Sequence, residues 1–522
     1  MADRPAPDSS GGEHPATESR TVASDTGLTV PPTAPTSLTA AQQSAVTELL
    51  RVSPVADDLG RRFQAAGYEL YLVGGSVRDA LLGRLGDDLD FCTDARPDRV
   101  LELLEGWAEA TWTTGIEFGT VGAARRGLRL EITTYRAEAY DRRSRNPVVR
   151  YGESLADDLV RRDFSINAMA VGLPDHRFVD LHGGLDDLAA RALRTPGAPE
   201  DSFADDPLRM LRAARFASQL RFTLAPEVVA AMTAMADQIT RITAERIRDE
   251  LTKLILGADP VTGLRLLVDT GLAAHVLPEL PDMRMEIDEH AQHKDVYEHT
   301  LTVLQQAIDL ESNGPDFVLR MAALLHDIGK PATREIQTAG GVSFHHHEVV
   351  GAKMTRRRMK ALRYPKDVTE QVATLVFLHL RFHGYGRGEW TDSAVRRYVT
   401  DAGDLLPRLH RLVRSDCTTR NKRRATALAR SYDTLEERIE RLAAEEDLAR
   451  IRPDLDGNAI MELLGIPPGP VVGKAWKHLK EVRLDRGQLS RDDAEAELFR
   501  WAAENAILPG GQGSTSAGPA AE

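Results

Sequence analysis

The sequence predicts an α+β protein in which an α/β head is followed by a long, all-helical body. In the head, short apolar runs alternate with helical segments, and the runs "YELYLVGG" and "DDLDFCT" have the pattern of strands. From Asp205 to about Arg500 the apolar residues follow almost only the helical period, and Pro and Gly mark breaks near 196, 257, 278, 331, 384 and 467. The 522 residues are several times the usual size of one domain, so the length predicts two to four domains.

Helices and strands alternate regularly in the head. The apolar pattern predicts a helix over 40–66, a strand at "YELYLVGG", a helix over 77–83, a strand at "DDLDFCT" and a helix over 97–108. Further strands fit "FGTVGAARR", "LRLEITTYR" and "RFVDL", and the paired glycines of "HGGLDDL" suit a tight turn after the last of these. The head is therefore expected to end near residue 190.

Composition changes sharply at both ends of the chain. Pro, Ser, Thr and Gly occupy 21 of the first 40 positions, and the last fourteen residues, from Pro509 onward, have the same character. Such segments do not bury enough apolar surface to fold. Residues 1–40 and 509–522 are therefore expected to be disordered tails.

The overall composition excludes several classes of protein. No stretch approaches the roughly 18 to 20 apolar residues that span a bilayer, and the N-terminus lacks a basic region followed by an apolar one, so a cytoplasmic protein without membrane contact is expected. Cys92 and Cys417 lie far apart, which argues against a disulfide framework or a zinc ribbon. A net charge of −13 argues against indiscriminate binding of nucleic acid.

Two local runs carry the opposite charge. Residues 353–366 contain seven Lys or Arg and no acidic residue, and residues 411–424 contain six basic residues and one acid. Each run could be a solvated helix face or a surface that follows a phosphate backbone.

Two carboxylates lie close together in the strand "DDLDFCT". Asp88 and Asp90 are separated by one residue, and the two-residue period of a strand places both side chains on the same face. Hard oxygen ligands at this spacing suit Mg²⁺, and two such ions would hold the attacking and leaving oxygens of a phosphoryl transfer. The alternative is a solvated strand end in which Leu89 points to the core.

The segment before these carboxylates favours the metal site. Gly74 and Gly75 end the preceding strand, and glycine lets successive backbone N–H groups turn toward an anion at the start of the next helix. Ser76 could hydrogen-bond a phosphate oxygen, and Arg78 would supply positive charge. The segment 74–91 therefore predicts a triphosphate pocket facing a metal site.

A second series of potential metal ligands occurs in the body. Residues 293–424 contain, in order, "HKDVYEHTL", "ALLHDIGKP", "FHHHEVVGAKM", "LVFLHLRFH" and "SDCTTRNKRR". A His-Asp pair on one helix, joined by His and Asp from other helices, can bind one or two divalent metals. Each histidine alone could equally be a capping or core residue, but the full series predicts a metal site.

Several stretches of the head together resemble one known family. "LVGGSVRDALLG", "DDLDF", "FGTV", "RRDFSINAMA", "LHGGLDDL" and "FADDPLRMLRAARF" resemble the polymerase-beta-type nucleotidyltransferases of the class II tRNA nucleotidyltransferase and poly(A) polymerase family, over roughly residues 68–280. The resemblance implies a polymerase-beta-like nucleotidyltransferase head. It also implies that Asp88 and Asp90 are the metal-binding catalytic carboxylates, and that Glu131 is a third carboxylate or the base that activates the primer hydroxyl.

The family motifs and the glycine corner together imply the nucleotide-binding residues. Arg162 and Asp163 match the motif that contacts the sugar and couples to movement of the head. The full expected set is Gly74, Gly75, Ser76, Arg78, Asp79, Arg162, Asp163, Asp206, Arg209 and Arg212.

Base selection is expected at "DDPLR". Asp205, Asp206 and Arg209 lie at a predicted helix start, where positions 206 and 209 would share one helix face, and a surface salt bridge is the alternative interpretation. In the family, an acidic-acidic-x-x-Arg motif selects the base. A carboxylate beside a guanidinium can accept from the amine of C or A and donate to the ring nitrogen. U and G present a carbonyl and a ring N–H instead, so neither hydrogen bond can form. Asp205 departs from the commoner Glu, and Arg212, one turn further on, could steady the base or the triphosphate.

The series in the body resembles the HD phosphohydrolase domain. Lys330 could meet a substrate phosphate, and the sequence leaves open which of His345, His346 and His347 would ligate. The domain could hydrolyse a 2′,3′-cyclic phosphate or a phosphate monoester at an RNA end, or it could be a structural remnant, and Mn, Ni, Co and Zn all suit an imidazole-rich site. The implied metal ligands are His299, His326, Asp327 and Asp416, with His347 and His379 for a second metal.

The resemblance implies template-independent addition of C, C and A to the 3′ end of tRNA from CTP and ATP, with Mg²⁺ in the head. The segment "YRAEAYDRRSRNPVVRYGESLADDLVRRDF" resembles the flexible loop associated with CCA addition, and the basic segment expected of bacterial poly(A) polymerases is not found. Addition of A alone, by a poly(A) polymerase or an A-adding enzyme, is the alternative within the family. A metal-dependent hydrolase whose head only binds nucleotide is an alternative of another class.

These boundaries combine into an expected order of domains. The two basic runs would be surfaces that contact the backbone of tRNA. Nothing in the sequence indicates an oligomeric state. The expected domains between the tails are a head at 41–190, a helical neck and RNA-binding body at 191–284, an HD metal-binding domain at 285–425 and a C-terminal helical region at 426–508.

Overall fold

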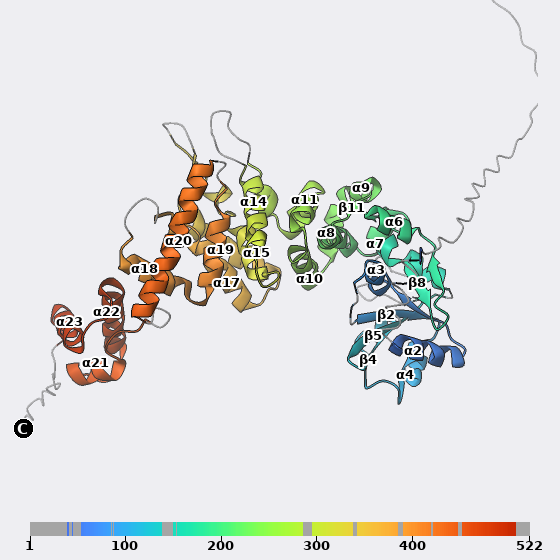
Figure 1. Cartoon of the computed structure of the whole chain (residues 1–522), viewed down its shortest axis with the longest axis horizontal. Coiled ribbons are helices and arrows are strands. Elements are labelled where there is room, and N and C mark those ends of the chain that lie inside the picture. Colours follow the sequence, from blue (N-terminus) through green and yellow to red (C-terminus); the bar gives the residue numbers. More distant parts are fainter. Residues whose placement is uncertain are drawn as a thin grey trace, which may run out of the picture.

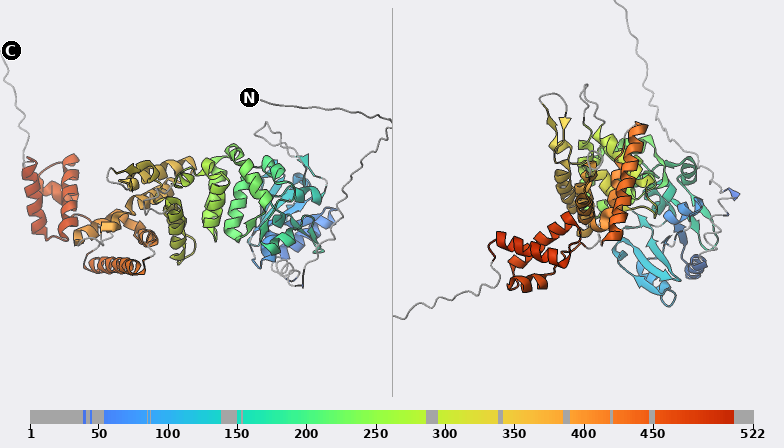
Figure 2. Two further views of the ribbon diagram at one scale, coloured as in Figure 1. Left: turned by 90° about the horizontal axis from the view of Figure 1, so that it is seen from above. Right: turned by 60° about the vertical axis from the view of Figure 1, so that its left-hand side comes forward.

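The computed structural model describes residues 39–40, 44, 54–84, 86, 88–137, 150–152, 154–285, 295–337, 342–384, 390–418, 421–446 and 451–507. The expected tails lie almost entirely outside the described residues, as do most of the first predicted helix before Pro54 and the loop at 138–149. The described parts of the chain lie along one long axis, with the sheet of the head at one end, the helices α8 to α20 in the middle and the last three helices at the other end (Figure 1 and Figure 2).

A seven-stranded mixed sheet forms the head. Its strands are β1 Leu70–Val73, β2 Asp88–Thr93, β3 Ala110–Trp112, β4 Thr120–Arg125, β5 Leu128–Thr134, β8 Met169–Gly172 and β9 Phe178–Asp180. Their order in the sheet is β3-β4-β5-β2-β1-β8-β9. Strands β2 and β5 are parallel, and the other neighbours are antiparallel.

Both faces of this sheet are covered. In β1, Leu70 and Leu72 belong to one buried cluster, and Tyr71 and Val73 belong to another, because alternate side chains of a strand point to opposite faces. The predicted α+β fold is therefore confirmed. The helices of the head are α2 Pro54–Ala65, α3 Gly75–Leu81, α4 Pro97–Leu104, α5 Leu155–Val160 and α6 Gly184–Ala190.

Two strands of the head were not predicted. Strand β8 is buried at all four positions, so it lacks the apolar–polar alternation by which a half-buried strand is recognised. Strand β3 has only three residues. Two-residue strands also occur, and they form the pairs β6 Arg136–Ala137 with β7 Arg150–Tyr151, β10 Ala192–Leu193 with β11 Thr223–Leu224, and β12 Glu335–Ile336 with β13 Val342–Ser343.

Helices build the rest of the described chain. The first group consists of α7 Pro199–Asp205, α8 Leu208–Leu220, α9 Pro226–Ala234, α10 Ala244–Ile255, α11 Pro260–Asp269, α12 Ala273–Val276 and α13 Glu279–Asp282. The second consists of α14 Val296–Asp309, α15 Phe317–Leu325, α16 His347–Ala361, α17 Lys366–Leu378, α18 Asp392–Ala402, α19 Leu406–Ser415 and α20 Lys422–Glu445. Short 3₁₀ helices lie at Ile116–Phe118, Ser165–Asn167, Ala236–Arg241, Pro331–Thr333, Arg381–Gly384 and Gly403–Leu405.

A buried arginine joins these two groups of helices. The guanidinium of Arg320, on α15, pairs with Glu311 at 2.6 Å and donates to the carbonyls of Ile255 and Gly257 at the end of α10. A cation at this position satisfies carbonyls that a helix C-terminus leaves without partners. The neck and the helices after it are therefore fixed to one another by a paired, buried charge.

The last three helices form a small unit with its own core. They are α21 Gly457–Leu464, α22 Pro470–Arg486 and α23 Arg491–Glu504, and they bury a separate cluster that includes Ile460, Leu479 and Leu498. Within the residues that the structure describes, no helix is both long and apolar enough to cross a membrane.

Candidate active site in the head and candidate metal centre in the body

Three carboxylates meet on one face of the head sheet. Asp88 and Asp90 are on β2 with the buried Leu89 between them, as the strand period predicted. The parallel register of β2 and β5 places Glu131 directly opposite Asp90. Burial, followed by the nearby Glu131 carboxylate, raises the pKa of Asp90. The raised pKa shows that keeping these carboxylates charged and close together is unfavourable. A hard divalent cation such as Mg²⁺ fits such oxygen donors and would offset their mutual repulsion.

Gly74 lets the backbone approach these carboxylates. Its φ is 72° and its ψ is −136°, a conformation that other residues adopt only with strain. A Cβ at this position would lie 3.0 Å from Nη1 of Arg162 and 3.6 Å from Oδ2 of Asp90. The glycine corner, Arg162 and the carboxylate-bearing face of β2 are therefore immediate neighbours.

The hydroxyl of Ser76 ties the corner to β2. It donates to the carbonyl of Asp88 at 3.2 Å and accepts from the backbone N–H of Asp90 at 3.2 Å. Its one hydrogen is therefore engaged, and donation to a phosphate would require the bond to Asp88 to break. In the described state Ser76 positions the strand that carries the carboxylates, a role that the sequence did not predict.

A hydrogen-bond network links the expected nucleotide-binding residues behind the corner. Arg78 forms a bidentate pair with Asp79 and donates to Oδ1 of Asn167 at 2.6 Å. The amide of Asn167 donates in turn to Asp163 at 2.9 Å, and Asp163 accepts from Nε of Arg212 at 2.9 Å. Asn167 is thus a functional candidate that sequence reasoning missed, although it lies inside the quoted motif "RRDFSINAMA".

This network holds Asp163 ionised. Burial alone would raise its pKa, but the Arg212 guanidinium and the Asn167 amide lower it to about 2. Three guanidinium groups, of Arg78, Arg212 and Arg215, also surround the ring of Phe216, at 4.0 to 5.6 Å from its centroid. Packing against this ring therefore holds the three guanidinium groups in place, and each of them is also paired with a carboxylate.

Asp206 and Arg209, the pair expected to select the base, do not share one helix face, so that part of the prediction was wrong. Helix α7 ends at Asp205, Asp206 is extended, and α8 begins after Pro207. Asp206 accepts from the N–H of Leu208 at 3.1 Å and from Arg246, on α10, at 2.7 Å. A residue before proline disfavours the helical conformation, which explains the break.

The partner residue, Arg209, is engaged separately. Its Nη1 donates to Oγ of Ser202 at 2.8 Å, and its Nη2 donates to the carbonyl of Arg161 at 2.6 Å. The Asp206 carboxylate and the Arg209 guanidinium are thus each held in orientation by hydrogen bonds to different neighbours. No local signal in the sequence marks Arg246 or Ser202 as those neighbours.

In the body, two sets of three side chains could each hold a metal ion. Within each set the ligand atoms lie within 4.8 Å of one another. Oδ1 of Asp416 lies 3.0 Å from Nε2 of His299, and Oδ1 of Asp327 lies 3.3 Å from Nε2 of His347. The two sets are His299, His326 and Asp416, and Asp327, His347 and His379.

The histidine tautomers suit metal binding. In His326, His347 and His379, Nδ1 lies 2.6 to 2.9 Å from a backbone carbonyl three residues earlier. A carbonyl only accepts, so Nδ1 carries the proton and Nε2 presents its lone pair to the centre. Nε2 of His347 and of His379 is buried without a hydrogen-bond partner among the described residues. The donor set therefore fits one or two divalent cations.

The pKa values of two of these histidines shift in opposite directions: against burial, the Asp327 carboxylate raises the pKa of His326. Burial, followed by the neighbouring His326, lowers the pKa of His379 to about 3, so this imidazole is neutral. The ammonium of Lys330 lies 2.6 Å from Oδ2 of Asp327. Of the three consecutive histidines, His347 is buried in the centre, whereas His345 and His346 are exposed.

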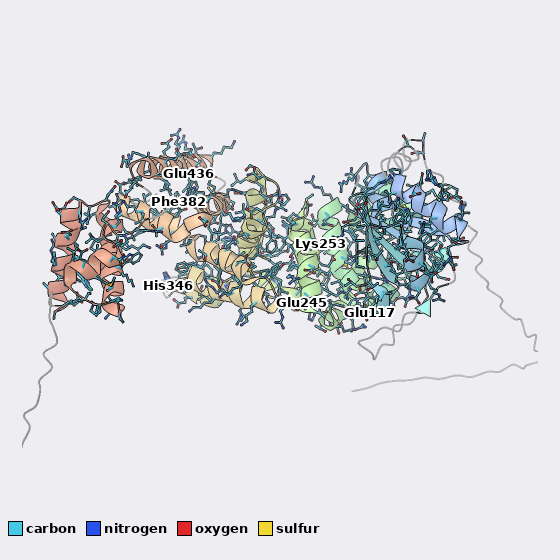
Figure 3. All side chains as sticks on the ribbon, turned by 90° about the horizontal axis from the view of Figure 1, so that it is seen from below. Glu117, Glu245, Lys253, His346, Phe382 and Glu436 are labelled. Atoms are coloured by element: carbon cyan, nitrogen blue, oxygen red, sulfur yellow. The ribbon has the colours of Figure 1, made fainter. Side chains whose placement is uncertain are left out.

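Gly329 explains why α16 can deliver His347. A Cβ at this glycine would lie 2.2 Å from the carbonyl oxygen of His347. The first turn of α16 therefore packs directly on the backbone that follows the His-Asp pair. The head and this centre lie in different parts of the chain: Glu117 marks the head in Figure 3, Glu245 and Lys253 mark α10, and His346 lies beyond them.

Family models match three consecutive regions of the chain. Residues 70–194 match a poly(A) polymerase head domain, and residues 221–283 match a region described as a probable RNA- and SrmB-binding site of polymerase A. Residues 296–421 match an HD domain. The matched regions contain the carboxylates of the head and both sets of ligands in the body.

Curated relatives match to different extents. A CCA-adding enzyme of Levilactobacillus brevis is 45% identical over 226 residues, which are 43% of this chain and 55% of that enzyme, so the chain spans about half the length of this relative. An A-adding tRNA nucleotidyltransferase of Deinococcus radiodurans is 36% identical over 447 residues, which are 83% of this chain and 95% of the relative.

Solved structures have the same fold. The CCA-adding enzyme of Bacillus stearothermophilus in complex with CTP has a TM-score of 0.61 at 24% identity and covers 90% of this chain and 99% of its own. The Thermotoga maritima CCA-adding enzyme complexed with tRNA has a TM-score of 0.55 at 17% identity, over 87% and 98% of the two chains. The full-length likeness to the Deinococcus enzyme, together with the three matched domains, shows that the chain belongs to the class II tRNA nucleotidyltransferase and poly(A) polymerase family and carries an HD domain.

Proposed function

We propose that this protein adds C, C and A to the 3′ end of tRNA from CTP and ATP and releases pyrophosphate. The observation that carries the proposal is the cluster of Asp88, Asp90 and Glu131 beside the Gly74 corner, with Asp206 at the junction of α7 and α8 and Arg209 in the first turn of α8. The first group supplies the chemistry of nucleotidyl transfer. The second supplies a way to choose the base without a template.

The head would work as a nucleotidyltransferase through fixed side chains. Asp88, Asp90 and Glu131 would hold Mg²⁺, which when bound neutralises the phosphate oxygens during the transfer. Arg162 and the backbone N–H groups of the Gly74 corner would bind the triphosphate. The 3′ hydroxyl of the tRNA attacks the α-phosphorus, the bond to the β-phosphate breaks, and the hydroxyl proton leaves with a nearby carboxylate or water.

Base selection would use Asp206 and Arg209. The carboxylate accepts from the exocyclic amine of C or A, and the guanidinium donates to the ring nitrogen. In the structure Asp206 accepts from Arg246, and Arg209 donates to Ser202 and to the carbonyl of Arg161. An incoming base would therefore compete with these partners for hydrogen bonds to the two side chains. U and G would leave both groups unpaired and be rejected.

Addition of C, C and A is favoured over addition of A alone by two observations. Two relatives named CCA-adding enzyme are 45% and 40% identical to the chain over 226 and 232 residues. The sequence of 135–164 also resembles the loop associated with CCA addition; its central residues lie outside the described residues, and its flanks pair as β6 and β7. The Deinococcus relative makes single-A addition the alternative.

Transfer RNA would be held along the helical body. Exposed Lys353, Arg357 and Lys360 lie on α16, and no ion pair engages their side chains among the described residues. Such groups bind a phosphate backbone without reading its sequence. We place this activity in the cytoplasm, where tRNA is matured.

Sequencing of reaction products tests the proposal. Purified protein would be incubated with tRNA that lacks its last three nucleotides, Mg²⁺ and all four ribonucleoside triphosphates, and the new 3′ ends would be sequenced. We expect ends that stop at CCA and contain no U or G. Long tracts of A would instead identify a poly(A) polymerase.

A second activity is supported by the centre in the body. The two sets of ligands around Asp327 and Asp416, with Nε2 of His347 and His379 lacking partners among the described residues, fit a divalent-metal phosphohydrolase. In hydrolysis of a 2′,3′-cyclic phosphate, the oxygen of water bonds to phosphorus, one ribose P–O bond breaks, and the ribose oxygen takes a proton.

Activity of this centre is tested with a metal series. We expect hydrolysis of bis(p-nitrophenyl) phosphate with at least one of Mn²⁺, Ni²⁺, Co²⁺ or Zn²⁺, and its loss in Asp327→Asn. Nucleotide addition by the head should be unchanged in this variant. Absence of hydrolysis with every metal would identify the centre as a structural remnant.

A further inference from the structure

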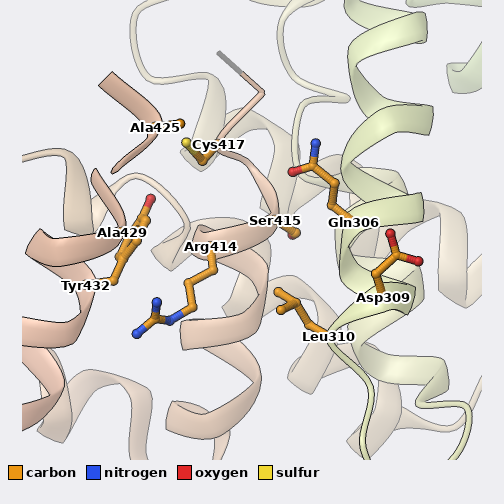
Figure 4. A pocket seen from close by; sticks show the side chains of 9 residues that line it. All are labelled: Gln306, Asp309, Leu310, Arg414, Ser415, Cys417, Ala425, Ala429 and Tyr432. Carbon is orange, nitrogen blue, oxygen red and sulfur yellow. The ribbon is translucent and has the colours of Figure 1, made fainter. Parts of the chain in front are cut away.

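A cavity of about 360 Å³ lies beside the metal centre of the body. Figure 4 shows Gln306 and Asp309 on α14, and Leu310 directly after it, facing Ala425 and Ala429 on α20, with the segment after α19 between the two helices. Helix α19 packs against both α14 and α20, which leaves this space between them. Its volume is in the range of cavities that bind small molecules.

The cavity and one set of metal ligands share their supporting elements. His299 precedes Gln306 on α14 by seven residues, so the two side chains share a helix face about 10 Å apart along the axis. Cys417, which lines the cavity, directly follows Asp416, whose carboxylate is 3.0 Å from His299. A phosphate at these ligands and a base in the cavity are thus separated by roughly the length of one nucleotide.

The lining suits the flat face and polar edge of a nucleobase. Leu310 is 39% exposed at the rim, and the opposite wall carries the small, apolar side chains of Ala425 and Ala429. Gln306 has no hydrogen-bond partner among the described residues, and one oxygen of Asp309 accepts from Gln305 at 2.9 Å. A carboxylate only accepts, so the ligand that it favours carries an amine, as adenine, cytosine and guanine do and uracil does not.

Charge at the start of α20 fits a ligand with phosphates. Lys422, Arg423 and Arg424 are exposed, and no ion pair engages their side chains within the part of the chain that the structure describes. Cations are unfavourable at a helix N-terminus. An RNA backbone entering the cavity from this side would offset that cost.

We infer that this cavity binds the terminal nucleoside of an RNA whose 2′,3′-cyclic or 3′-terminal phosphate lies at His299, His326 and Asp416, and that it prefers bases with an exocyclic amine. The inference rests on the hydrolase activity proposed for the centre. It adds the residues that hold the base and the bases that they favour.

Filling the cavity tests the inference. Ala429→Trp places a large side chain in the cavity, and Ala427→Trp makes the same change on the same helix at a position that does not line it. We expect the first variant to lower kcat/KM for adenosine 2′,3′-cyclic monophosphate by about 10-fold or more and the second to leave it within about twofold. Neither should change hydrolysis of bis(p-nitrophenyl) phosphate. Equal use of the nucleotide by both variants would overturn the inference.

Base preference and RNA preference are tested on the wild-type protein. The adenosine substrate should exceed its uridine counterpart by about 10-fold in kcat/KM, because uracil offers no amine to Asp309. An oligoribonucleotide with the same cyclic end should exceed the mononucleotide. Equal use of adenosine and uridine, or a better mononucleotide, would contradict the proposed ligand.

Binding without chemistry separates this inference from the hydrolase proposal. If the wild type hydrolyses no substrate with any metal, the hydrolase proposal fails, and adenosine 3′-monophosphate binding to the two variants is measured by calorimetry. At least about 10-fold weaker binding to Ala429→Trp than to Ala427→Trp would support the cavity site. Equal affinities would overturn it. The head is the same in both variants, so nucleotide binding by the head contributes equally to both and does not affect the comparison.

Discussion

Asp90→Asn should lower kcat for nucleotide addition by about 10³-fold, equivalent to about 4 kcal/mol of transition-state stabilisation. Asp90 lies on the buried side of the carboxylate cluster, opposite Glu131 and beside the Gly74 corner. The amide is similar in shape but removes one charge that a divalent cation requires. Because the same change removes repulsion from a desolvated carboxylate, the midpoint of thermal unfolding without metal should stay the same or rise.

The matched control for this variant is Asp98→Asn. Asp98 is an exposed residue of α4 in the same head, and the change in net charge is identical. Rates should be measured with CTP and with ATP on tRNA primers of the appropriate length. A loss of less than about 10-fold in Asp90→Asn would show that this carboxylate is not a ligand of the reacting metal.

Asp206→Asn should reduce discrimination between CTP and UTP by about 10²-fold. An asparagine can present a donor to the carbonyl of uracil, whereas the carboxylate can only accept. The amide also loses its ion pair with Arg246, so kcat/KM for CTP should fall while that for UTP rises. The measurement is kcat/KM for each of the four nucleotides on the same tRNA.

Asp201→Asn provides the control for charge. Asp201 is an exposed carboxylate on α7, outside the "DDPLR" motif, and its replacement removes the same charge from a nearby position. This variant should keep the ratio of CTP to UTP close to that of the wild type. If both variants changed the ratio equally, selection would depend on local charge rather than on pairing with Asp206.

Local periodicity was enough to predict that Asp88 and Asp90 lie on one face of β2. The side chains of a strand alternate, so Asp88 and Asp90 had to point away from the core if Leu89 pointed into it. Leu89 is 2% exposed, so this placement is confirmed, whereas metal binding at the two carboxylates stays a prediction. The glycine corner before it was also predictable, because Gly-Gly at a strand end followed by a helix is a local pattern.

Contacts between residues that are far apart in the chain could not be predicted from the sequence. The register that sets Asp90 opposite Glu131 joins residues about forty positions apart in the sequence, and it depends on packing of the whole sheet. The same holds for Asn167, whose two hydrogen bonds connect α3 to the segment before β8. The choice of His347 over its two neighbours required the close approach of α16 to Gly329.

The error at Asp206 could have been avoided. Asp206 precedes Pro207, and proline restricts the residue before it to extended conformations. A helix start at Pro207 was therefore the better prediction, and it matches the preference of proline for the first positions of helices. The engagement of Asp206 by Arg246 depends on α10 and has no such local signal.

Incubation of the protein with CTP as the only nucleotide tests the central claim most directly. The substrate is tRNA that ends before its last three nucleotides, with Mg²⁺ present, and the products are sized at single-nucleotide resolution. A CCA-adding head predicts extension by two nucleotides and then arrest until ATP is supplied. No extension by CTP, with a single addition from ATP on tRNA that already ends in CC, would contradict the claim and identify an A-adding enzyme like the Deinococcus relative.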